Sequence, residues 1–509
     1  MTTSPKRALI SVYHKRGIDK LASALSKNGW EIISTGGTAS FLETNSIPVI
    51  KVSDITGFPE ILGGRVKTLH PKIFGPILAE NSVEHNKELA DFSLSRIDLV
   101  IVNFYPFEEY LKNNTDLQTM VEKIDIGGPS MVRAAAKNFK DTIVIVRESD
   151  YGIVEEKIIP GDISFSEKKD LASKAFLYTS YYDSLIGKYL NEGDISESEF
   201  LNISGKKFFD PRYGENPHQK GSIYITDDNS PIKNLIQHQG KKLSYNNILD
   251  VSVVYDLLNQ FSTEKDHFCV IAKHQNPCGA ALCESQDSAF ENALSGDPVS
   301  AFGGIVGFNK RIDGPCALRM SKIFLEVIIA PEFSDKALSV FKKKKNLRLI
   351  QLKPGYIEKD HFRSIQGGFI IQEKDNLNKS LSEFDLVTGR ELTSREKADV
   401  SFGWKILKFI KSNAILIVKD RKILGVGAGQ MSRIDSVNIA IQKSGNSVKG
   451  SILLSDAFFP FSDSIETAHE NGISVVVEPG GSVRDSEVIN AGESSGISLL
   501  FTGVRHFLH

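Results

Sequence analysis

The feature that most constrains this fold is a repeated alternation of short apolar runs with stretches of helical periodicity. In residues 1–150 the apolar runs are Ala8–Val12, Glu31–Ile33, Ile47–Val52, Leu99–Val102 and Thr142–Val146. Apolar residues at helical spacing follow the first run, from Ile18 to Leu25, and Thr38 suits the N-cap of a second helix. Buried strands separated by helices are typical of a parallel sheet covered on both faces, so we expect an α/β domain here.

The same alternation returns after a helical segment, Lys168–Leu190, and a polar stretch, Asn191 to Ser198. Seven further apolar runs follow, namely Cys269–Ala272, Gly304–Phe308, Val327–Ala330, Ala414–Val418, Ser451–Leu454, Ile473–Val477 and Ile497–Phe501. They favour two stacked α/β units rather than one. A chain of 509 residues also exceeds what one hydrophobic core usually supports. We predict domains at residues 1–200 and 201–509.

Composition narrows the classes of partner. The formal net charge is −2, which gives no reason to expect nucleic acid, and the lysine run 342–345 is typical of a solvated surface. We find no signal-peptide pattern at the N-terminus and no run of about 18 apolar residues, so we expect a cytoplasmic protein without membrane contact. The four cysteines are expected to be reduced thiols.

Two glycine-containing blocks in the first domain have the character of an anion site. Ser34-Thr-Gly-Gly-Thr38 lies between an expected strand and helix, where backbone amides and a helix N-terminus favour a phosphate. Alone, such a turn is equally compatible with a structural role. The second block, Gly63-Gly-Arg-Val-Lys-Thr-Leu-His-Pro71, places two cations two residues apart behind two glycines. No GxxxxGK[ST] loop is present in the chain, which argues against ATP hydrolysis.

Three more blocks follow at expected strand ends, where ligand sites of open α/β sheets normally form. They are Asn103-Phe-Tyr-Pro-Phe107, Asp125-Ile-Gly-Gly-Pro129 and Arg133-Ala-Ala-Ala-Lys-Asn138. The last is typical of a helix with cations at i and i+4, and surface charge would explain Lys137 taken in isolation. All five blocks together indicate a ligand site.

In these blocks and their spacing the first domain resembles inosine monophosphate (IMP) cyclohydrolase, which shares the fold of methylglyoxal synthase. The resemblance implies that Lys67, Tyr105, Asp125 and Lys137 are catalytic, with Lys137 as proton donor and acceptor. It also implies a set of nucleotide-binding residues: Lys15, Ser34, Thr35, Gly36, Gly37, Arg65, Thr68, Asn103 and Ile126. The expected reaction is ring closure of formyl-AICAR with loss of water, in which positioning and modest acid–base assistance suffice.

The first domain departs from the family pattern in two places. The family's SVSDKTG is Ser11-Val-Tyr-His-Lys-Arg-Gly17 here, and its HGGILA-like stretch is Phe74-Gly-Pro-Ile-Leu-Ala79. The aspartate-to-histidine change at position 14 reverses the charge that this residue can carry beside an expected nucleotide contact. The expected acid–base residues are all retained, so we expect a changed rate or affinity rather than loss of activity.

The most informative block of the second domain is Lys273-His-Gln-Asn-Pro-Cys-Gly279, which directly follows an expected strand. An imidazole beside an ammonium suits proton transfer at neutral pH. Further blocks rich in glycine, asparagine, arginine and aromatic residues accompany it: Arg212–Gln219, Lys242–Asn247, Ala301–Gly304, Gly427–Arg433, Ser455–Phe461, Pro479–Ser482 and Phe501–His506. The dipeptide alone would favour a structural loop, and these neighbours favour an active site.

From about Lys206 to His509 these blocks resemble AICAR transformylase, a pair of cytidine-deaminase-like α/β units that transfers a formyl group from 10-formyltetrahydrofolate to AICAR. The resemblance implies His274 as the base, Lys273 as transition-state stabiliser and Asn413 as the residue that holds the formyl oxygen. It implies AICAR contacts from Arg212, Tyr213, Gly303, Glu326 and Arg433. The folate side would comprise Ile434, Phe458, Asp463, Gly481 and Arg505.

The same resemblance implies a homodimer with transformylase sites across the subunit interface. We expect no catalytic metal, because no His–x–Glu is present and Cys278 finds its next cysteine only at Cys283. The run Gly425–Gln430 lacks the third glycine of a dinucleotide loop. A structural potassium ion bound by backbone carbonyls would leave no motif, so this question stays open.

Two other functions compete for the first domain. It could be a ligand-sensing regulatory module, since domains of this fold serve as allosteric sensors. Retention of Lys67, Tyr105, Asp125 and Lys137 together favours catalysis, because a sensor needs only the phosphate clamp. A methylglyoxal-synthase-like lyase is disfavoured by the block Thr56–Pro71, which is specific to the nucleotide enzyme. Turnover of synthetic formyl-AICAR separates these functions.

Overall fold

The computed structural model describes residues 5–113, 115–191 and 198–509. The chain divides into two compact units, unit 1 (Met1–Ser204) and unit 2 (Gly205–His509), which we describe separately. Most of the predicted polar stretch Asn191–Ser198 lies outside the described residues. Within the described parts of the chain, none of the helices has the length and apolarity that crossing a membrane requires.

Unit 1 is built on a five-stranded parallel sheet, as the sequence predicts. Its strand order is β3-β2-β1-β4-β5, and the strands are β1 (Arg7–Val12), β2 (Glu31–Ser34), β3 (Ile50–Lys51), β4 (Leu99–Asn103) and β5 (Ile143–Ile145). Four strands match the predicted apolar runs closely. The run Ile47–Val52 yields only two strand residues, because Val52 already begins a helix.

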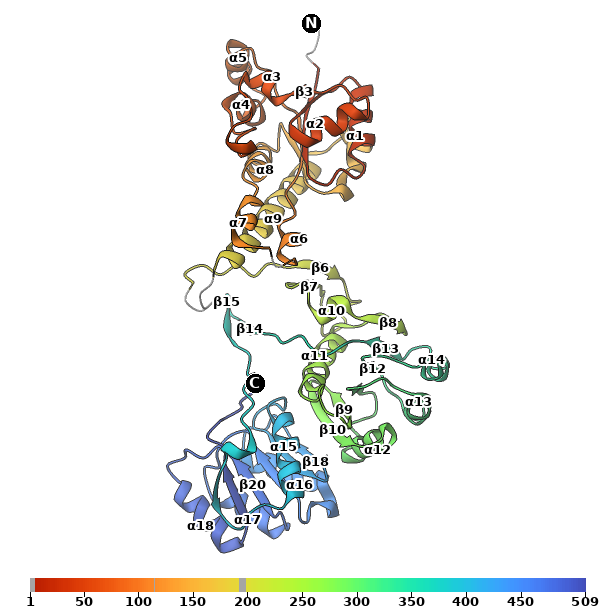
Figure 1. Ribbon diagram of the computed structural model, residues 1–509, viewed down its shortest axis with the longest axis vertical. Coiled ribbons are helices and arrows are strands. Elements are labelled where there is room, and N and C mark those ends of the chain that lie inside the picture. The colour runs from red at the N-terminus through yellow and green to blue at the C-terminus, as the bar shows by residue number, and fades with distance from the viewer. Residues whose placement is uncertain (1–4, 114, 192–197) are drawn as a thin grey trace. The chain divides into compact units, whose positions relative to one another are not determined.

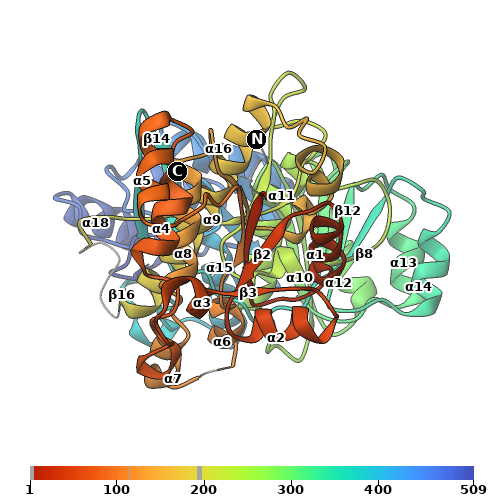
Figure 2. The ribbon, with the colours of Figure 1, turned by 90° about the horizontal axis from the view of Figure 1, so that it is seen from above.

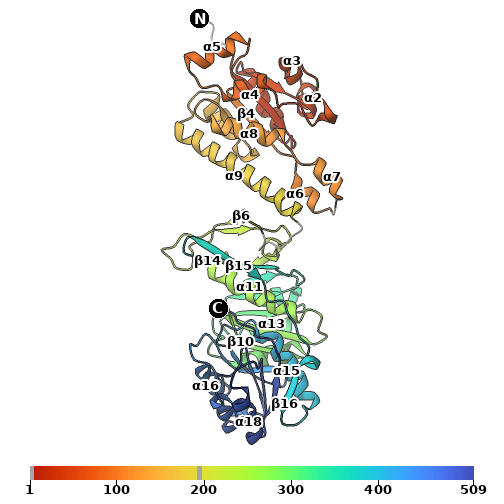
Figure 3. The same cartoon turned by 90° about the vertical axis from the view of Figure 1, so that its left-hand side faces the viewer.

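Helices cover both faces of this sheet because alternate strand residues point to opposite sides. Along β1, Ala8, Ile10 and Val12 join one core, which includes α1 (Ile18–Lys27) and α2 (Gly36–Thr44), while Leu9 joins the other. Figure 2 shows α1 on one side of β2, and α4 (Pro71–Leu78), α8 (Gly127–Lys137) and α9 (Phe165–Leu190) on the other. In Figure 3 the long α9 runs beside α8. The N-cap of α2 is Thr35 rather than the predicted Thr38, so this helix starts directly in the glycine pair.

Smaller helices fill the connections of unit 1. They are α3 (Val52–Thr56), the 3-10 turn η1 (Leu62–Gly64), α5 (Val83–Asp91), α6 (Phe107–Leu111) and α7 (Leu117–Glu122), followed after β5 by η2 (Glu148–Asp150) and the π-helical turn η3 (Val154–Ile158). The turn η1 falls within the predicted anion-binding block. It brings the glycines of that block near the carboxyl ends of the strands.

Unit 2 contains a continuous twelve-stranded sheet of order β16-β21-β20-β19-β17-β18-β10-β9-β11-β12-β13-β8. The strands are β8 (Ile236–Gln239), β9 (His267–Lys273), β10 (Asn276–Cys283), β11 (Ile305–Phe308), β12 (Val327–Ala330), β13 (Arg348–Gln351), β16 (Asp385–Thr388), β17 (Ile415–Lys419), β18 (Lys422–Gly427), β19 (Ile452–Ser455), β20 (Val475–Glu478) and β21 (Ser498–Phe501). All seven predicted runs contribute strands. The sequence did not predict β8, β10, β13, β16 and β18.

The two halves of this sheet repeat one arrangement. Each half has an antiparallel hairpin (β9–β10, β17–β18), three parallel strands (β11–β13, β19–β21) and an antiparallel edge strand (β8, β16). The halves, green and blue in Figure 1, join where β10 pairs with β18 at Ala281 and Lys422. The predicted pair of α/β units is therefore confirmed, and the two share one sheet.

The helices of unit 2 follow the same duplication. One face of the sheet is covered by α11 (Tyr245–Gln260) and α15 (Ser394–Leu407). The other face is covered by α12 (Gln286–Gly296), α13 (Gly314–Met320) and α14 (Asp335–Phe341) in the first half, and by α16 (Arg433–Ser444), α17 (Asp463–Glu470) and α18 (Asp485–Ser495) in the second. Two small hairpins, β6–β7 (Lys206–Phe209, Ile223–Ile225) and β14–β15 (Asp360–Ile365, Gly368–Glu373), lie outside the sheet. The short α10 (Pro231–Asn234) and η5 (Leu381–Glu383) each precede an edge strand, and η6 (Gly445–Val448) follows α16.

Candidate functional sites

In unit 1 the two predicted anion-binding blocks meet at Lys67. The Lys67 ammonium lies 3.2 Å from Glu60 Oε2, and Thr35 Oγ1 donates a 2.8 Å hydrogen bond to Glu60 Oε1. A Cβ atom on Gly36 would lie 3.2 Å from Lys67 Nζ, and one on Gly64 would lie 2.8 Å from Lys67 Cε. Both glycines have positive φ, so they supply the turn conformation as well as the space. The glycines therefore allow a cation to reach the N-terminus of α2, which is a setting for an anion.

Asp125 lies close to the same cation at the start of α8. Its Oδ1 accepts the Gly128 N–H at 2.8 Å, and its backbone N–H donates to Tyr182 Oη at 2.8 Å. Burial raises the pKa of the Asp125 carboxyl, while the N–H groups of Gly128 and Tyr105 and the charge of Lys67 oppose the rise. The structure therefore brings together Lys67, Tyr105 and Asp125. Thr68 belongs to the same group, because a Cβ on Gly127 would lie 3.0 Å from Thr68 Oγ1, and the exposed Ile126 is adjacent.

Three of the predicted nucleotide contacts form hydrogen bonds with backbone groups of this chain. Asn103 Oδ1 accepts the backbone N–H groups of Tyr13 at 2.5 Å and His14 at 3.1 Å, so this side chain orders the loop after β1. Lys15 Nζ donates to Val12 O at 2.8 Å, and burial lowers the pKa of this ammonium. Ser34 Oγ is buried and donates to Ile10 O at 2.7 Å. The nucleotide contacts expected of these three residues stay predictions.

Arg65 and Lys137 lie apart from the Lys67–Asp125 group. The Arg65 guanidinium pairs with Glu122 on α7, and both side chains are exposed. Lys137 is the last residue of α8, whereas Asp125 precedes the first, so at 1.5 Å per residue about 15 Å of helix separates Gly127 from Lys137. Within one chain Lys137 thus lies at the end of α8 opposite to Asp125, and the proton transfer expected of it stays a prediction.

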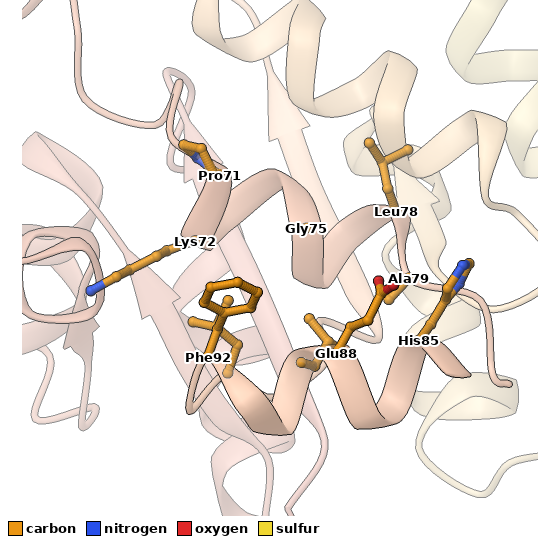
Figure 4. A pocket seen from close by; sticks show the side chains of 10 residues that line it. Pro71, Lys72, Gly75, Leu78, Ala79, His85, Glu88 and Phe92 are labelled. Atoms are coloured by element: carbon orange, nitrogen blue, oxygen red, sulfur yellow. The ribbon is translucent and has the colours of Figure 1, made fainter. Parts of the chain in front are cut away.

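A cavity of about 450 Å³ lies between α4 and α5 in unit 1 (Figure 4). Its lining includes Gly75, Leu78, Ala79, Leu89 and Phe92, and Figure 4 shows the Phe92 ring between the two helices. None of the predicted site residues lines it. The departure from the family pattern at positions 74–79 falls partly on this cavity rather than on the Lys67–Asp125 group.

In unit 2 the predicted base lies in the tight turn that joins β9 to β10. His274 and Gln275 both adopt left-handed backbone conformations, with φ of 52° and 63°. The preceding Lys273 Nζ donates to Phe302 O at 2.8 Å, which brings the ammonium next to Gly303. Gln275 N–H donates to Asp250 Oδ1 on α11 at 2.7 Å.

Asn276 joins this turn to the second half of the sheet. Its Nδ2 donates to His274 O at 3.1 Å, and its Oδ1 accepts the Lys411 N–H at 3.0 Å. Lys411 is two residues before Asn413, whose peptide bond with Ser412 is cis. The predicted base and the predicted formyl-holding amide are thus connected by one side chain, although they are far apart in sequence.

Asn413 lies in a network of charged and polar groups. Its Oδ1 accepts Arg433 Nη2 at 2.7 Å, and Arg433 Nη1 donates to Asp456 Oδ1 at 2.6 Å. Asp456 is fully buried and Arg433 is 8% exposed, so this is a desolvated ion pair of fixed geometry. Asn413 Nδ2 donates to the carbonyls of Gln430 at 2.9 Å and Met431 at 3.1 Å. Both hydrogens of the amide are therefore engaged, and one must be released before Asn413 can donate to a formyl oxygen.

The predicted AICAR contacts of the first half lie around the His274 turn. Gly303 N–H donates to Phe324 O at 2.8 Å, and Glu326 Oε2 accepts Asn247 Nδ2 at 2.9 Å. Burial raises the pKa of Asp250, the charge of His274 opposes the rise and that of Glu326 adds to it, so these acidic groups and the imidazole are neighbours. Arg212 and Tyr213 lie in the loop between β6 and β7, which Asn246 Nδ2 ties to α11 through Glu215 O at 3.3 Å.

The predicted folate residues gather where β18–β21 lead into their following loops. Ile434 is in the first turn of α16, Phe458 follows β19, Asp463 begins α17, Gly481 follows β20, and Arg505 follows β21. The Gly481 N–H donates to Asp485 Oδ2 at 2.8 Å, and the Arg505 guanidinium lies 4.4 Å from the Phe507 ring. The carboxyl ends of the parallel strands β19–β21 share one edge of the sheet, so these loops form a common surface.

Sequence reasoning missed several groups of these sites. Glu60, Asp250, Asp456 and Glu478 were not singled out, although Glu60 and Asp456 lie inside quoted blocks. Glu478 ends β20, is fully buried and accepts the Phe459 N–H at 2.7 Å through Oε2. Its Oε1 has no hydrogen-bond partner among the described residues. Burial raises the pKa of Glu478 to about 8. The sequence signal for it is a single acidic residue at the end of an apolar run.

The predicted free thiols are confirmed: Cys269, Cys278, Cys283 and Cys316 form no disulfide. Across the residues for which the structure gives positions, no group of three or more His, Cys, Asp or Glu side chains is arranged to hold a metal ion.

Comparison with known proteins gives one consistent result along the whole chain. Residues 135–443 match the family model described as AICARFT/IMPCHase bienzyme, and residues 17–130 match that of the MGS-like domain. The chain is similar to the bifunctional purine biosynthesis protein PurH of Caldicellulosiruptor saccharolyticus, at 47% identity over 99% of this chain and 100% of that protein. The proteins of the same name from a Thermoanaerobacter strain and from Aquifex aeolicus are 46% and 45% identical, with the same coverage.

Proposed function

The chain belongs to the AICARFT/IMPCHase bienzyme family, and from this membership we propose which of its residues carry each of the two activities. The enzyme carries out the last two steps of IMP synthesis, formylating AICAR and closing the product to IMP. We assign formyl transfer to unit 2 and ring closure to unit 1. The expected cytoplasmic location stays a prediction.

The link through Asn276 between the His274 turn and the Lys411–Asn413 segment carries the assignment for unit 2. Formyl transfer needs a base for the AICAR amine and a donor for the oxygen on which charge develops. His274 is the proposed base that takes the amine proton. Lys273 is the neighbouring cation, and Asn413 is the proposed oxygen donor once it releases one backbone carbonyl.

The surface formed by the loops after β18–β21 fits a folate. It offers the partly exposed Phe458 ring and the Arg505 guanidinium. An aromatic ring can stack on a pterin, and a cation can pair with the carboxylates of a folate tail. The folate supplies the formyl group, and the chain's residues bind and orient it.

In unit 1, ring closure joins the carboxamide nitrogen to the formyl carbon and releases water. We propose that Lys67 and the Thr35–Gly37 turn hold the phosphate and that Glu60 gives way to it. Asp125 and Tyr105 flank the reacting groups, and Asp125, whose pKa burial raises, is suited to pass a proton to the departing oxygen. Of the family's expected acid–base residues, Lys137 receives no role in this proposal.

A homodimer is the proposed assembly. The hairpin β14–β15 lies outside the large sheet and exposes a set of large apolar side chains, namely Phe362, Ile365, Phe369 and Ile370. An isolated two-stranded hairpin is marginally stable in water, and exposed apolar clusters of this kind are typical of subunit interfaces. Sedimentation velocity would show a dimer of 56.2 kDa chains, and a concentration-independent monomer would contradict the assignment.

The experiment that tests the function supplies AICAR and 10-formyltetrahydrofolate and follows both tetrahydrofolate and IMP. Wild type should release both products, and synthetic formyl-AICAR alone should yield IMP. Tetrahydrofolate without IMP would restrict the function to formyl transfer and leave unit 1 as a ligand-sensing module. Release of neither product would refute both assignments.

A further inference from the structure

The turn that carries His274 is an unfavourable one for its residues. It joins two antiparallel strands through two residues with positive φ, a geometry that glycine adopts freely and other residues only uncommonly. Something outside the turn must therefore hold its backbone. A small rotation of this backbone would move the imidazole that projects from it.

Asp250, in the second turn of α11, is the group that holds it. Its Oδ1 accepts the Gln275 N–H at 2.7 Å. Burial raises the pKa of this carboxyl, and the backbone N–H groups of Gln275 and His274 oppose the rise. Helix α11 is itself anchored by a capping box at Ser244 and Asn247, and Asn247 also bonds to Glu326. The carboxylate is therefore held on a rigid element whose apolar side packs against the sheet.

The second half of the sheet has a similar turn, also held by a carboxylate on a helix, but this turn carries no imidazole. The turn between β17 and β18 contains Asp420 and Arg421, with φ of 54° and 52°. The Asp399 carboxylate on α15 accepts their N–H groups at 3.0 Å and 2.5 Å. The duplication shows that a helix-borne carboxylate is how this fold fixes such a turn.

The two turns differ in what they are joined to. In the first, Asn276 follows the turn and bonds to both His274 O and the Lys411 N–H, two residues from Asn413. The corresponding residue in the second is Lys422, and its turn is closed by ion pairs instead. Arg421 pairs with Asp266 at 2.7 Å, and Asp420 pairs with Arg395 at 2.6 Å.

We propose that Asp250 is a positioning residue for formyl transfer, because its carboxylate fixes the backbone of the His274–Gln275 turn from which the imidazole projects. The inference rests on the proposed role of His274. Asp250 touches neither substrate nor reacting atoms in this account, and its effect passes through the turn.

The test compares Asp250→Ala and Asp250→Asn with Asp399→Ala, which removes the same kind of hydrogen bonds from the duplicate turn. Steady-state formyl transfer gives kcat and KM for AICAR, and thermal unfolding gives Tm. We expect Asp250→Ala to lower kcat about 100-fold with KM within about 3-fold, since misplacing a reacting group by about 1 Å has effects of this size. Asp250→Asn keeps one acceptor oxygen and should lose about 10-fold.

Asp399→Ala should lower Tm about as much as Asp250→Ala and leave kcat within about 3-fold. Equal loss of kcat in the two alanine variants, or a loss in Asp250→Ala confined to KM, would overturn the inference. If Asp250→Ala does not fold, Asp250→Asn serves as the test, and an unchanged kcat in that variant would also overturn the inference. Ring closure of synthetic formyl-AICAR should be normal in every variant. If the wild-type enzyme showed no formyl transfer, the proposed function would be refuted. The hydrogen bond by which Asp250 holds the turn would not be affected by that result.

Discussion

Replacement of Glu478 by glutamine should stabilise unit 2, and the gain should grow with pH. Glu478 is fully buried, and burial raises its pKa from 4.5 to about 8. Asp485 adds to the rise, while the Phe459 N–H and Arg433 oppose it. An acid whose pKa is higher in the folded state binds its proton more tightly there. Its contribution to stability is therefore fully present below pH 4.5 and is lost as pH rises towards 8.

The size of this effect follows from the two pKa values. Each unit of pKa difference corresponds to about 1.4 kcal/mol. The cost of keeping Glu478 buried therefore grows by that amount per pH unit above pH 4.5, and it levels at about 5 kcal/mol at pH 8. At pH 7 it is about 3 kcal/mol. Glutamine retains an oxygen for the Phe459 N–H and has no proton to lose, so Glu478→Gln removes the penalty.

The assay is urea unfolding of wild type and Glu478→Gln at pH 5, 6, 7 and 8. A Trp30→Phe background leaves the buried Trp404 as the fluorescent reporter of unit 2. Glu396→Gln is the matched control of opposite sign, because the Arg390 guanidinium lowers the pKa of Glu396 to about 2, and that variant should lose stability at neutral pH. A stability difference between Glu478→Gln and wild type that stays constant from pH 5 to pH 8 would refute the reasoning.

Three further outcomes are expected. His274→Ala should lower kcat of formyl transfer by about 10²- to 10⁴-fold and leave ring closure of synthetic formyl-AICAR intact. Loss of both activities, each assayed with its own substrate, would contradict the separation of the sites. Lys67→Ala should impair IMP formation far more than Lys137→Ala, measured by absorbance of the closed purine, whereas the reverse order would return the acid–base role to Lys137. Gly425→Ala should lower the free energy of unfolding by about 1–3 kcal/mol in urea, because its Cβ would lie 2.1 Å from a carbonyl oxygen of α16, while Gly187→Ala, with open space around it, should not lower it.

The sequence predicted the strands that are apolar on both faces and missed five others of the large sheet, of which β10 and β18 contain glycine. Strand β18 contains Gly425 and Gly427, which resembled part of a loop, yet a Cβ at either position would come within 2.1 Å of a backbone oxygen of α16. Close packing of helix on strand, rather than a turn, explains these glycines. Strand β10 was missed for the same reason, since Gly279 lies against the Ala293 carbonyl.

For the site, motifs identified the residue types but not their partners. Lys137 was grouped with Asp125 because both lie in recognisable blocks, although the intervening helix carries them to opposite ends. Asn103, Lys15 and Ser34 are predicted ligand contacts, and the structure adds that their polar atoms also bond to neighbouring backbone, which no motif reveals. The hydrogen bond between Gln275 and Asp250 joins residues 25 positions apart, and the one between Asn276 and Lys411 joins residues 135 positions apart. No local sequence pattern reveals contacts over such separations.

The pairing of β10 with β18 has a consequence for how this enzyme can vary. The imidazole belongs to one copy of the duplicated unit and the amide of Asn413 to the other, so the distance between them depends on how the two copies slide along their shared seam. Substitutions at that seam can therefore retune the reaction while every chemical group stays in place. The other end of this seam, where Arg421 pairs with Asp266 and Lys422 with Ala281, also joins the two copies and so helps to set the same distance.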